Sequence, residues 1–115
     1  MHSCGSIEPL IQYMIEAGVD VLNPVQISAN NMEPDTLKKR YGDKICFWGG
    51  GCNTQQVLGF KTPEEVRENV RYLTGILGKN SGFVFNQVHN IMGNVPAENI
   101  VAMLDEAYEC SWINK

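Results

Sequence analysis

Short apolar runs alternate with helical patterns along this 115-residue chain, and that alternation restricts its fold. The apolar runs cover residues 19–23, 44–49 and 82–86, and the helical patterns cover residues 6–17, 34–41, 62–77 and 96–110. Short, nearly continuous apolar strands are typical of parallel sheets that lie under crossover helices. We therefore predict an α/β fold with three parallel strands, in which right-handed crossovers place all four helices on one side of the sheet.

Start signals support the predicted helices. Thr62 and Glu65 form a capping box, and Pro34 and Pro96 are well placed for the first turns of two further helices. Ser6 is the predicted cap of the first helix. The apolar side of the last helix is predicted to consist of Ile100, Val101, Leu104, Ala107 and Tyr108.

Composition narrows the possible classes of function. A formal net charge of -4 and a pI near 5.0 give no electrostatic attraction to nucleic acid or to an anionic membrane surface, so neither is an expected partner. No apolar run approaches the roughly 18 residues of a membrane span, and the N-terminal region lacks the pattern of a secretory signal. We expect a cytoplasmic protein that binds a small molecule.

The cysteines lie far apart and form no C-x-x-C pair, so we expect reduced thiols and not a zinc knuckle or a redox motif. Cys46 lies within an apolar run, which predicts a buried and inert side chain. Cys52 could be a metal ligand or a nucleophile, but the sequence places no activating base beside it. A small loop residue is the favoured interpretation of Cys52.

Polar residues follow each predicted strand, and they include Asn23, Gln26, Gln87, His89, Asn90 and the segment 52–55. The glycines at 49–51 lack the lysine and the spacing of a P-loop, so we interpret them as a sharp turn that directs Cys52, Asn53 and Gln55 toward a cavity. Because parallel strands end at one edge of a sheet, residues that follow them should share one side of the molecule. The predicted group is His2, Cys4, Cys52, Gln55 and His89.

Six segments carry a family pattern: HSCG at 2–5, GVDVLNPVQ at 18–26, FWGGGCNTQ at 47–55, TPEEV at 62–66, FVFNQVHNI at 83–91 and VPAEN at 95–99. Together, in order and spacing, they resemble the uroporphyrinogen decarboxylase family. The resemblance implies a partial TIM (β/α)8 barrel, namely about the last three βα units with a preceding helix. Residues 1–115 would then be the C-terminal part of a barrel domain whose earlier part lies outside this chain.

The resemblance also implies a reaction, the cofactor-free decarboxylation of tetrapyrrole side chains. The residues implied for substrate binding are Gln26, Asn53, Gln55 and His89. In the family, the aspartate and basic residues of the reaction come from early loops that this chain does not contain. Asn53 stands where the family commonly has aspartate, so it cannot act as a carboxylate base. We therefore expect a fragment or split subunit that carries part of the pocket and is inactive alone.

Zinc-dependent corrinoid methyltransferases, which share this fold, offer a second interpretation. Their His-x-Cys motif resembles His2 and Cys4, and their third ligand follows the last strand, where this chain has His89. Such a site would hold zinc with an open position for a substrate thiol and would act with a corrinoid partner. Two further interpretations remain open: His89 as a loop histidine with a satisfied hydrogen bond, and the whole chain as a non-catalytic assembly module.

A three-stranded sector leaves the inner face of its sheet and two strand edges open, whereas a complete barrel closes them. The candidate apolar groups on or near these surfaces are Val21, Phe47, Phe83 and Phe85. Exposing several such side chains would cost about 1.5–3 kcal/mol each. We therefore predict that the chain is not a monomer. It should form a homo-oligomer or bind a separate chain that carries the first half of the barrel.

Overall fold

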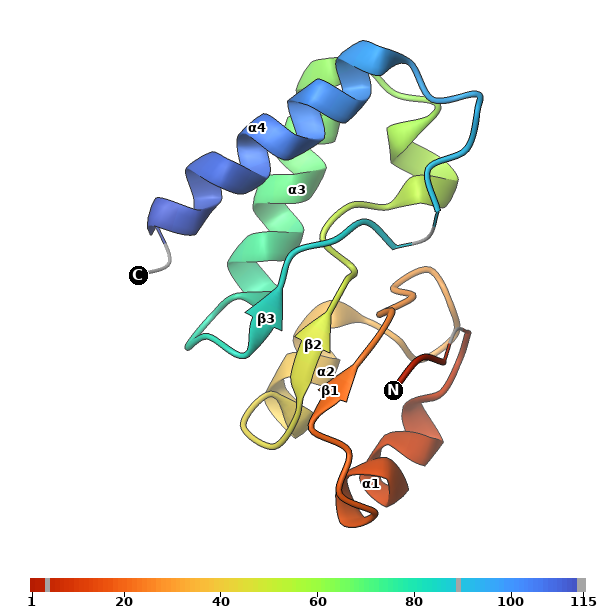
Figure 1. The fold of residues 1–115 in the computed structure, drawn as a ribbon, viewed down its shortest axis with the longest axis vertical. Helices are drawn as coiled ribbons and strands as arrows, with labels where there is room; N and C mark the ends of the chain where they lie inside the picture. Colours follow the sequence, from red (N-terminus) through yellow and green to blue (C-terminus); the bar gives the residue numbers. More distant parts are fainter. Residues whose placement is uncertain (4, 89, 114–115) are drawn as a thin grey trace.

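The computed structural model describes residues 1–3, 5–88 and 90–113, with the backbone alone at positions 55, 112 and 113. The helices are α1 (Glu8–Glu16), α2 (Pro34–Tyr41), α3 (Pro63–Leu77) and α4 (Ala97–Ile113), the strands are β1 (Val21–Leu22), β2 (Cys46–Trp48) and β3 (Phe83–Val84), and η1 (Thr54–Leu58) is a π-helical turn. Figure 1 shows their arrangement. The predicted order of helices and strands is confirmed, although the strands are shorter than the apolar runs and η1 was not predicted. Within the described ranges, no helix is long and apolar enough to cross a membrane.

The sheet has the order β1-β2-β3, and both pairings are parallel, as the alternation of elements predicts. Phe47 in the central strand lies level with Leu22 on one side and with Phe83 on the other. The ladder of β1 stops before Pro24, which has no N–H to donate. This stop accounts for the short first strand.

Residues 1–3 lie along the other edge of β1. His2 forms a parallel bridge with Asn23, the N–H of Ser3 donates to the carbonyl oxygen of Asn23 at 2.8 Å, and Asn23 N–H donates to the Met1 carbonyl at 2.9 Å. These contacts make residues 1–3 resemble the end of a further parallel strand. The structure is therefore a sector of parallel strands, consistent with part of a (β/α)8 barrel.

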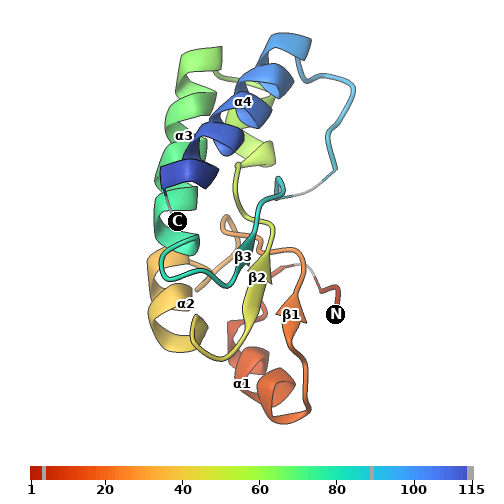
Figure 2. The ribbon, with the colours of Figure 1, turned by 60° about the vertical axis from the view of Figure 1, so that its left-hand side comes forward.

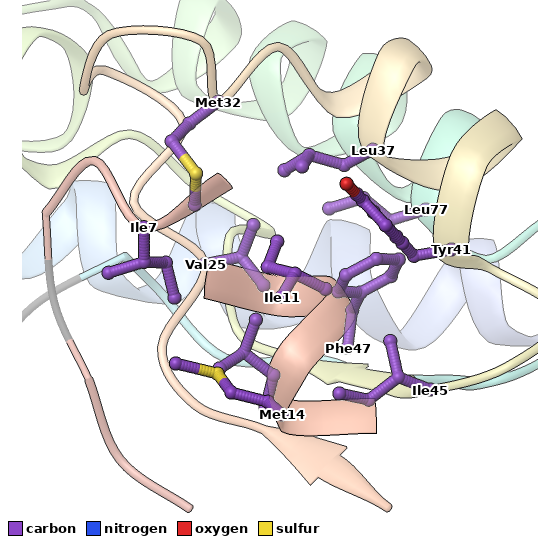
Figure 3. Close-up of a cluster of buried hydrophobic side chains, with 11 residues drawn as sticks. Ile7, Ile11, Met14, Val25, Met32, Leu37, Tyr41, Ile45, Phe47 and Leu77 are labelled. Carbon is purple, nitrogen blue, oxygen red and sulfur yellow. The ribbon is translucent and has the colours of Figure 1, made fainter. Parts of the chain in front are cut away.

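Helices cover one face of the sheet (Figure 2). Leu22 and Phe47 are fully buried on this face, in a cluster to which α1, α2 and the end of α3 contribute. Figure 3 shows Phe47 within that cluster, together with Ile11 of α1 and Leu37 of α2. Burying a side chain such as Phe47 stabilises the fold by about 1.5–3 kcal/mol. This cluster attaches three helices to one side of the strands, as predicted.

The opposite face of the sheet carries the side chains that alternate with the buried ones. Trp48 is 45% exposed and Val84 is 40% exposed, while Val21 and Cys46 are half-buried. The full burial predicted for Cys46 was wrong, because successive strand side chains point to opposite faces and the neighbouring Phe47 lies on the helix side.

Three of the four residues predicted for the open surfaces pack elsewhere. Phe47 belongs to the first cluster, Phe83 packs against that cluster, and Phe85 packs against a second one. Only Val21 is left among the predicted candidates for the open face. Trp48 and Val84 supply the exposed apolar surface instead.

A second cluster joins α3, α4 and η1, and α4 lies along α3 in Figures 1 and 2. The buried side of α4 consists of Asn99, Ala102, Met103, Glu106 and Cys110. The predicted apolar side was wrong for Val101, Leu104 and Tyr108, which are each more than half exposed, whereas Ala107 packs against the second cluster as predicted. The fourth helix therefore covers α3 and η1 and extends the helical layer away from the first cluster.

Polar contacts explain why the less apolar side of α4 faces α3 and η1. Glu106 pairs with Arg71 of α3, with an Nε–Oε1 distance of 2.7 Å. Asn99 Nδ2 donates to the carbonyl oxygens of Leu58 at 2.8 Å and Lys61 at 2.9 Å. The Asn99 side chain thus holds the start of α4 against the end of η1 and the residues that follow it.

Capping signals were confirmed for α3 but not for α1. The N–H of Glu65 donates to Thr62 Oγ1 at 3.3 Å, as the capping box predicts. Ser6 does not cap α1, because the helix begins at Glu8. The Ser6 hydroxyl donates instead to the carbonyl oxygen of Asn30. Glu8 instead accepts hydrogen bonds from Arg40 at 2.6 Å and from Tyr41 at 2.8 Å, which joins α1 to α2.

The glycine-rich turn after β2 has the unusual backbone angles that its sequence predicts. Gly49 and Gly50 have φ values of 111° and 81°, which L-residues with side chains rarely adopt. Gly51 is constrained differently, because a Cβ at this position would overlap the ring of Phe85. The turn thus packs directly against the segment that follows β3.

We predict that Gly51→Ala lowers the free energy of unfolding by about 1–3 kcal/mol, because the added methyl group must displace the Phe85 ring. The matched control is Gly75→Ala within α3, where a Cβ meets nothing within 4 Å, and this change should stabilise the chain by about 0.5–1 kcal/mol. Urea unfolding followed by circular dichroism, at one protein concentration, measures both. Equal unfolding midpoints for Gly51→Ala and the unaltered chain would contradict the close packing.

Cys52 is fully buried in the second cluster, and this burial raises the pKa of its thiol to about 12. Because the thiolate is the reactive form, we predict that iodoacetamide at about pH 8 leaves Cys52 unlabelled in the folded chain but labels it in concentrated guanidinium chloride. The half-buried Cys46 is the internal comparison and should react faster. Peptide mass spectrometry reads out each site, and rapid labelling of Cys52 in the folded chain would contradict its burial.

Candidate functional site

Two adjoining cavities lie around the carboxyl ends of the strands. The larger cavity, of about 470 Å³, is lined by Met1, His2, Val21, Asn23, Trp48 and Asn86. The smaller cavity, of about 150 Å³, is lined by His2, Asn23, Pro24, Asn86, Gln87, Val88 and Asn90. His2, Asn23 and Asn86 border both cavities, so we treat them as one candidate site. Ligand sites of (β/α)8 barrels are built at this end of the strands.

Asn23 connects three segments around the candidate site. Its Oδ1 atom lies 2.9 Å from Nδ1 of His2, and its Nδ2 atom donates to the carbonyl oxygen of Trp48 at 3.1 Å. The Asn23 backbone also pairs with residues 1–3, as described above. These hydrogen bonds hold His2, the end of β1 and the end of β2 in a fixed arrangement beside the cavities.

Gln26, a predicted substrate-binding residue, follows β1 and has a structural contact. Its Oε1 atom accepts a hydrogen bond from the backbone N–H of Gly5 at 2.8 Å, across 21 residues of sequence. The contact is partly buried and joins the loop after β1 to the segment that leads into α1. Gln26 lines neither of the two cavities.

Asn53, another predicted substrate-binding residue, starts the π-helical turn. Its Oδ1 atom accepts from the N–H of Gln56 at 3.0 Å, and its own N–H donates to Oδ1 of Asn69 in α3 at 2.9 Å. The expectation that the glycine turn directs Cys52 toward the cavity was wrong, because Cys52 lies in the core under α3 and α4. The side chain of Gln55 lies outside the described part of the chain.

The predicted zinc ligands are only partly described. His2 borders both cavities, whereas Cys4 and His89 lie outside the described residues. Within residues 1–3, 5–88 and 90–113, no three His, Cys, Asp or Glu side chains gather as a metal site requires. Val88 and Asn90, the sequence neighbours of position 89, both line the smaller cavity.

Two cavity residues were not singled out from the sequence. Trp48 was assigned to an apolar strand, and Asn86 was assigned to the end of the third strand. The signal that could have identified Trp48 is strand alternation, since a buried Phe47 requires its neighbour to face the other side. For Asn86, the signal is a polar side chain at the carboxyl end of an otherwise apolar run.

Comparison with known proteins shows that the chain is similar to uroporphyrinogen decarboxylases. The sequence profile of the family described as uroporphyrinogen decarboxylase (URO-D) matches residues 1–110. A uroporphyrinogen decarboxylase of Psychromonas ingrahamii is 35% identical over 76 residues, which are 66% of this chain and 21% of that protein. One from Methylococcus capsulatus is 28% identical over 101 residues, which are 88% of this chain and 27% of that protein.

A third relative, the uroporphyrinogen decarboxylase of Aliivibrio salmonicida, is 36% identical over 75 residues, covering 64% of this chain and 20% of that protein. The matched part of the chain thus spans between a fifth and about a quarter of the length of these relatives. The profile match extends over nearly the whole chain, and the parallel strands agree with the fold that the resemblance implied. The chain belongs to the uroporphyrinogen decarboxylase family.

Proposed function

We propose that this chain supplies part of the active-site pocket of a decarboxylase that acts on the side chains of a tetrapyrrole. It is a fragment or split subunit that is inactive alone. Family membership supports the reaction class. The observation that carries the proposal is the cavity pair bordered by His2, Asn23 and Asn86 at the carboxyl ends of the strands.

In this proposal the substrate is bound by Gln26, Asn53, Gln55 and His89. Asn53 and Gln26 have amide side chains, which can donate and accept hydrogen bonds but do not act as general acids or bases at neutral pH. Their contacts with Gln56 and Gly5 give them a fixed position in the loops. The groups that move protons in the reaction come from another part of the barrel, and no cofactor takes part.

The partner is a second polypeptide that continues the parallel sheet. Two features support this: β3 is an edge strand, and Trp48 and Val84 expose apolar surface on the uncovered face. The exposed Val101, Leu104 and Tyr108 of α4 supply a further apolar stripe. Either another copy of the chain or a separate chain with the first half of the barrel would bury these groups, and the second would also complete the pocket.

One observation favours the zinc-dependent methyltransferase as a second candidate. Nδ1 of His2 lies 2.9 Å from the amide oxygen of Asn23, which resembles the contacts that orient metal-bound histidines. In this interpretation, zinc would be held by His2, Cys4 and His89. The zinc would keep a substrate thiol as a thiolate, ready to accept a methyl group from a corrinoid partner.

The experiment that tests the leading proposal is reconstitution. The Methylococcus capsulatus enzyme, truncated before the segment that matches this chain, is assayed with uroporphyrinogen alone and after mixing with the purified chain. We predict no turnover by either part alone and decarboxylation by the mixture. The relative's own C-terminal segment is the positive control. Turnover by the isolated chain, or restoration by the control segment but not by this chain, would contradict the proposal.

Metal analysis separates the two candidates. The decarboxylase hypothesis predicts no stoichiometric zinc in the purified chain. It also predicts that Cys4→Ser leaves the metal content unchanged. About one zinc per chain that is lost in Cys4→Ser, with Cys110→Ser as the matched control, would instead favour the methyltransferase. Inductively coupled plasma mass spectrometry after extensive dialysis provides the measurement.

A further inference from the structure

A hollow of about 290 Å³ lies at the amino ends of the strands, beside the turns that precede β2 and β3. Its lining consists of Lys38, Lys39, Gly42, Asp43, Lys79 and Asn80. We propose that this lysine hollow is a binding site for a small anion with several negative charges, of the class of phosphate esters and diphosphates. The site is separate from the cavities at the carboxyl ends of the strands, and it does not depend on the reaction proposed above.

The lysine hollow concentrates positive charge in an acidic chain. Three ammonium groups and one carboxylate line it, which gives a formal charge of +2, whereas the whole chain has a net charge of -4. The helices α2 and α3 end just before residues of this lining, and each helix end contributes about half a negative charge. A net positive charge of about one therefore remains for a ligand to neutralise.

No carboxylate pairs with the lysines of the hollow. In residues 1–3, 5–88 and 90–113, the ion pairs are formed by Arg40, Arg67 and Arg71, and none includes a lysine. Lys39 and Lys79 are exposed. Three like charges at one hollow repel one another, so binding an anion there removes an unfavourable interaction.

Lys38 is held in place at the hollow. Its Nζ atom donates to the carbonyl oxygen of Ser81 at 2.7 Å, across 43 residues of sequence. A Cβ at Gly42 would lie 2.7 Å from Cδ of Lys38, so glycine leaves room for the lysine side chain beside the end of α2. Partial burial lowers the pKa of Lys38, and a bound anion would favour its charged form.

The turn that carries Lys79 has an uncommon backbone. Asn80, Ser81 and Gly82 have φ values of 61°, 62° and 77°, in the left-handed region that residues with side chains rarely adopt. Such residues are frequent where a turn clamps a ligand. An anion bound by Lys38 and Lys79 would connect this turn to α2, and we therefore expect binding to stabilise the fold.

The size and the charge of the hollow define the class of ligand. Its volume lies at the lower limit of small-molecule sites, which occupy about 300–1,000 Å³, so it suits a ligand much smaller than a tetrapyrrole. Lysine ammonium groups are compact charges on flexible stems, and they bind phosphate groups as point charges. Three of them favour a ligand with more than one negative charge.

Titration with inorganic pyrophosphate tests the proposal. The ¹⁵N-labelled full chain is titrated at constant ionic strength near pH 7, and the backbone N–H signals of Gly42 and Asn80 are followed by NMR. We predict saturation with a Kd below about 1 mM. Inorganic phosphate should bind at least about tenfold more weakly because it carries less charge, and acetate should not saturate the site.

Variants with equal charge locate the effect. Lys79→Gln and Lys39→Gln should each weaken pyrophosphate binding by at least about fivefold, because each removes one charge from the hollow. The matched control is Lys61→Gln, which removes the same charge just before the other end of α3, outside this lining. Its effect on the affinity should be less than about twofold, since exposed charges at that distance are screened by salt. Circular dichroism confirms that each variant is folded.

A thermal unfolding measurement adds a second readout. Pyrophosphate at about ten times its Kd should raise the Tm of the unaltered chain and of Lys61→Gln, and the same concentration should raise it less in Lys79→Gln. The proposal would be overturned by a titration that does not saturate by about 10 mM, or by signal changes spread over the whole surface. Equal weakening by Lys79→Gln and Lys61→Gln would also overturn it. None of these results depends on whether reconstitution restores decarboxylation.

Discussion

The alternation of side chains along β2 is the constraint on which the other elements depend. Phe47 points to the helix side, where it is fully buried, and Trp48 points to the other side, where it is nearly half exposed. The parallel neighbours continue this division, with Leu22 on the covered side and Val84 on the open side. Helices pack where the first set points, and the cavities form beside the second set at the carboxyl ends of the strands. The helices thus cover one face of this small sheet, and the candidate site lies beside the other face.

Backbone groups and amide side chains make many of the contacts that hold the segments around the site. Asn23 connects residues 1–3, β1 and β2, while Gln26 holds the segment before α1. Within the part of the chain that the structure describes, the lysines and arginines lie in α2, in α3 and in the nearby turns, and none of them lines the cavities. A sector of this kind can form part of the wall of a pocket, with His2, Asn23 and Asn86 at its border. This distribution agrees with a chain that contributes part of an active site.

Local sequence signals predicted the helices and strands well. They could not predict features that depend on tertiary packing, such as the buried side of α4. The Thr62 capping box, the bounds of α2 and the parallel order followed from sequence patterns, because each depends on neighbouring residues or on a short period. The orientation of α4 did not, since Asn99 and Glu106 find partners on η1 and α3 that no local pattern reveals. Cys52 was misplaced for a related reason: it packs in the second cluster with residues of α3 and α4, which are distant in the sequence. The family motifs identified the loops of the site, but strand alternation was needed to add Trp48.

We propose that the open face of this sector is covered by further protein. Light scattering of the purified chain at micromolar concentration, coupled to size-exclusion chromatography, tests it most directly. The account predicts a mass of at least twice the 12.8 kDa of one chain, unless a separate polypeptide co-purifies and completes the sheet. A soluble species of 12.8 kDa with cooperative unfolding and no bound polypeptide would contradict it, because the exposed surface of Trp48, Val84 and α4 would then need no partner.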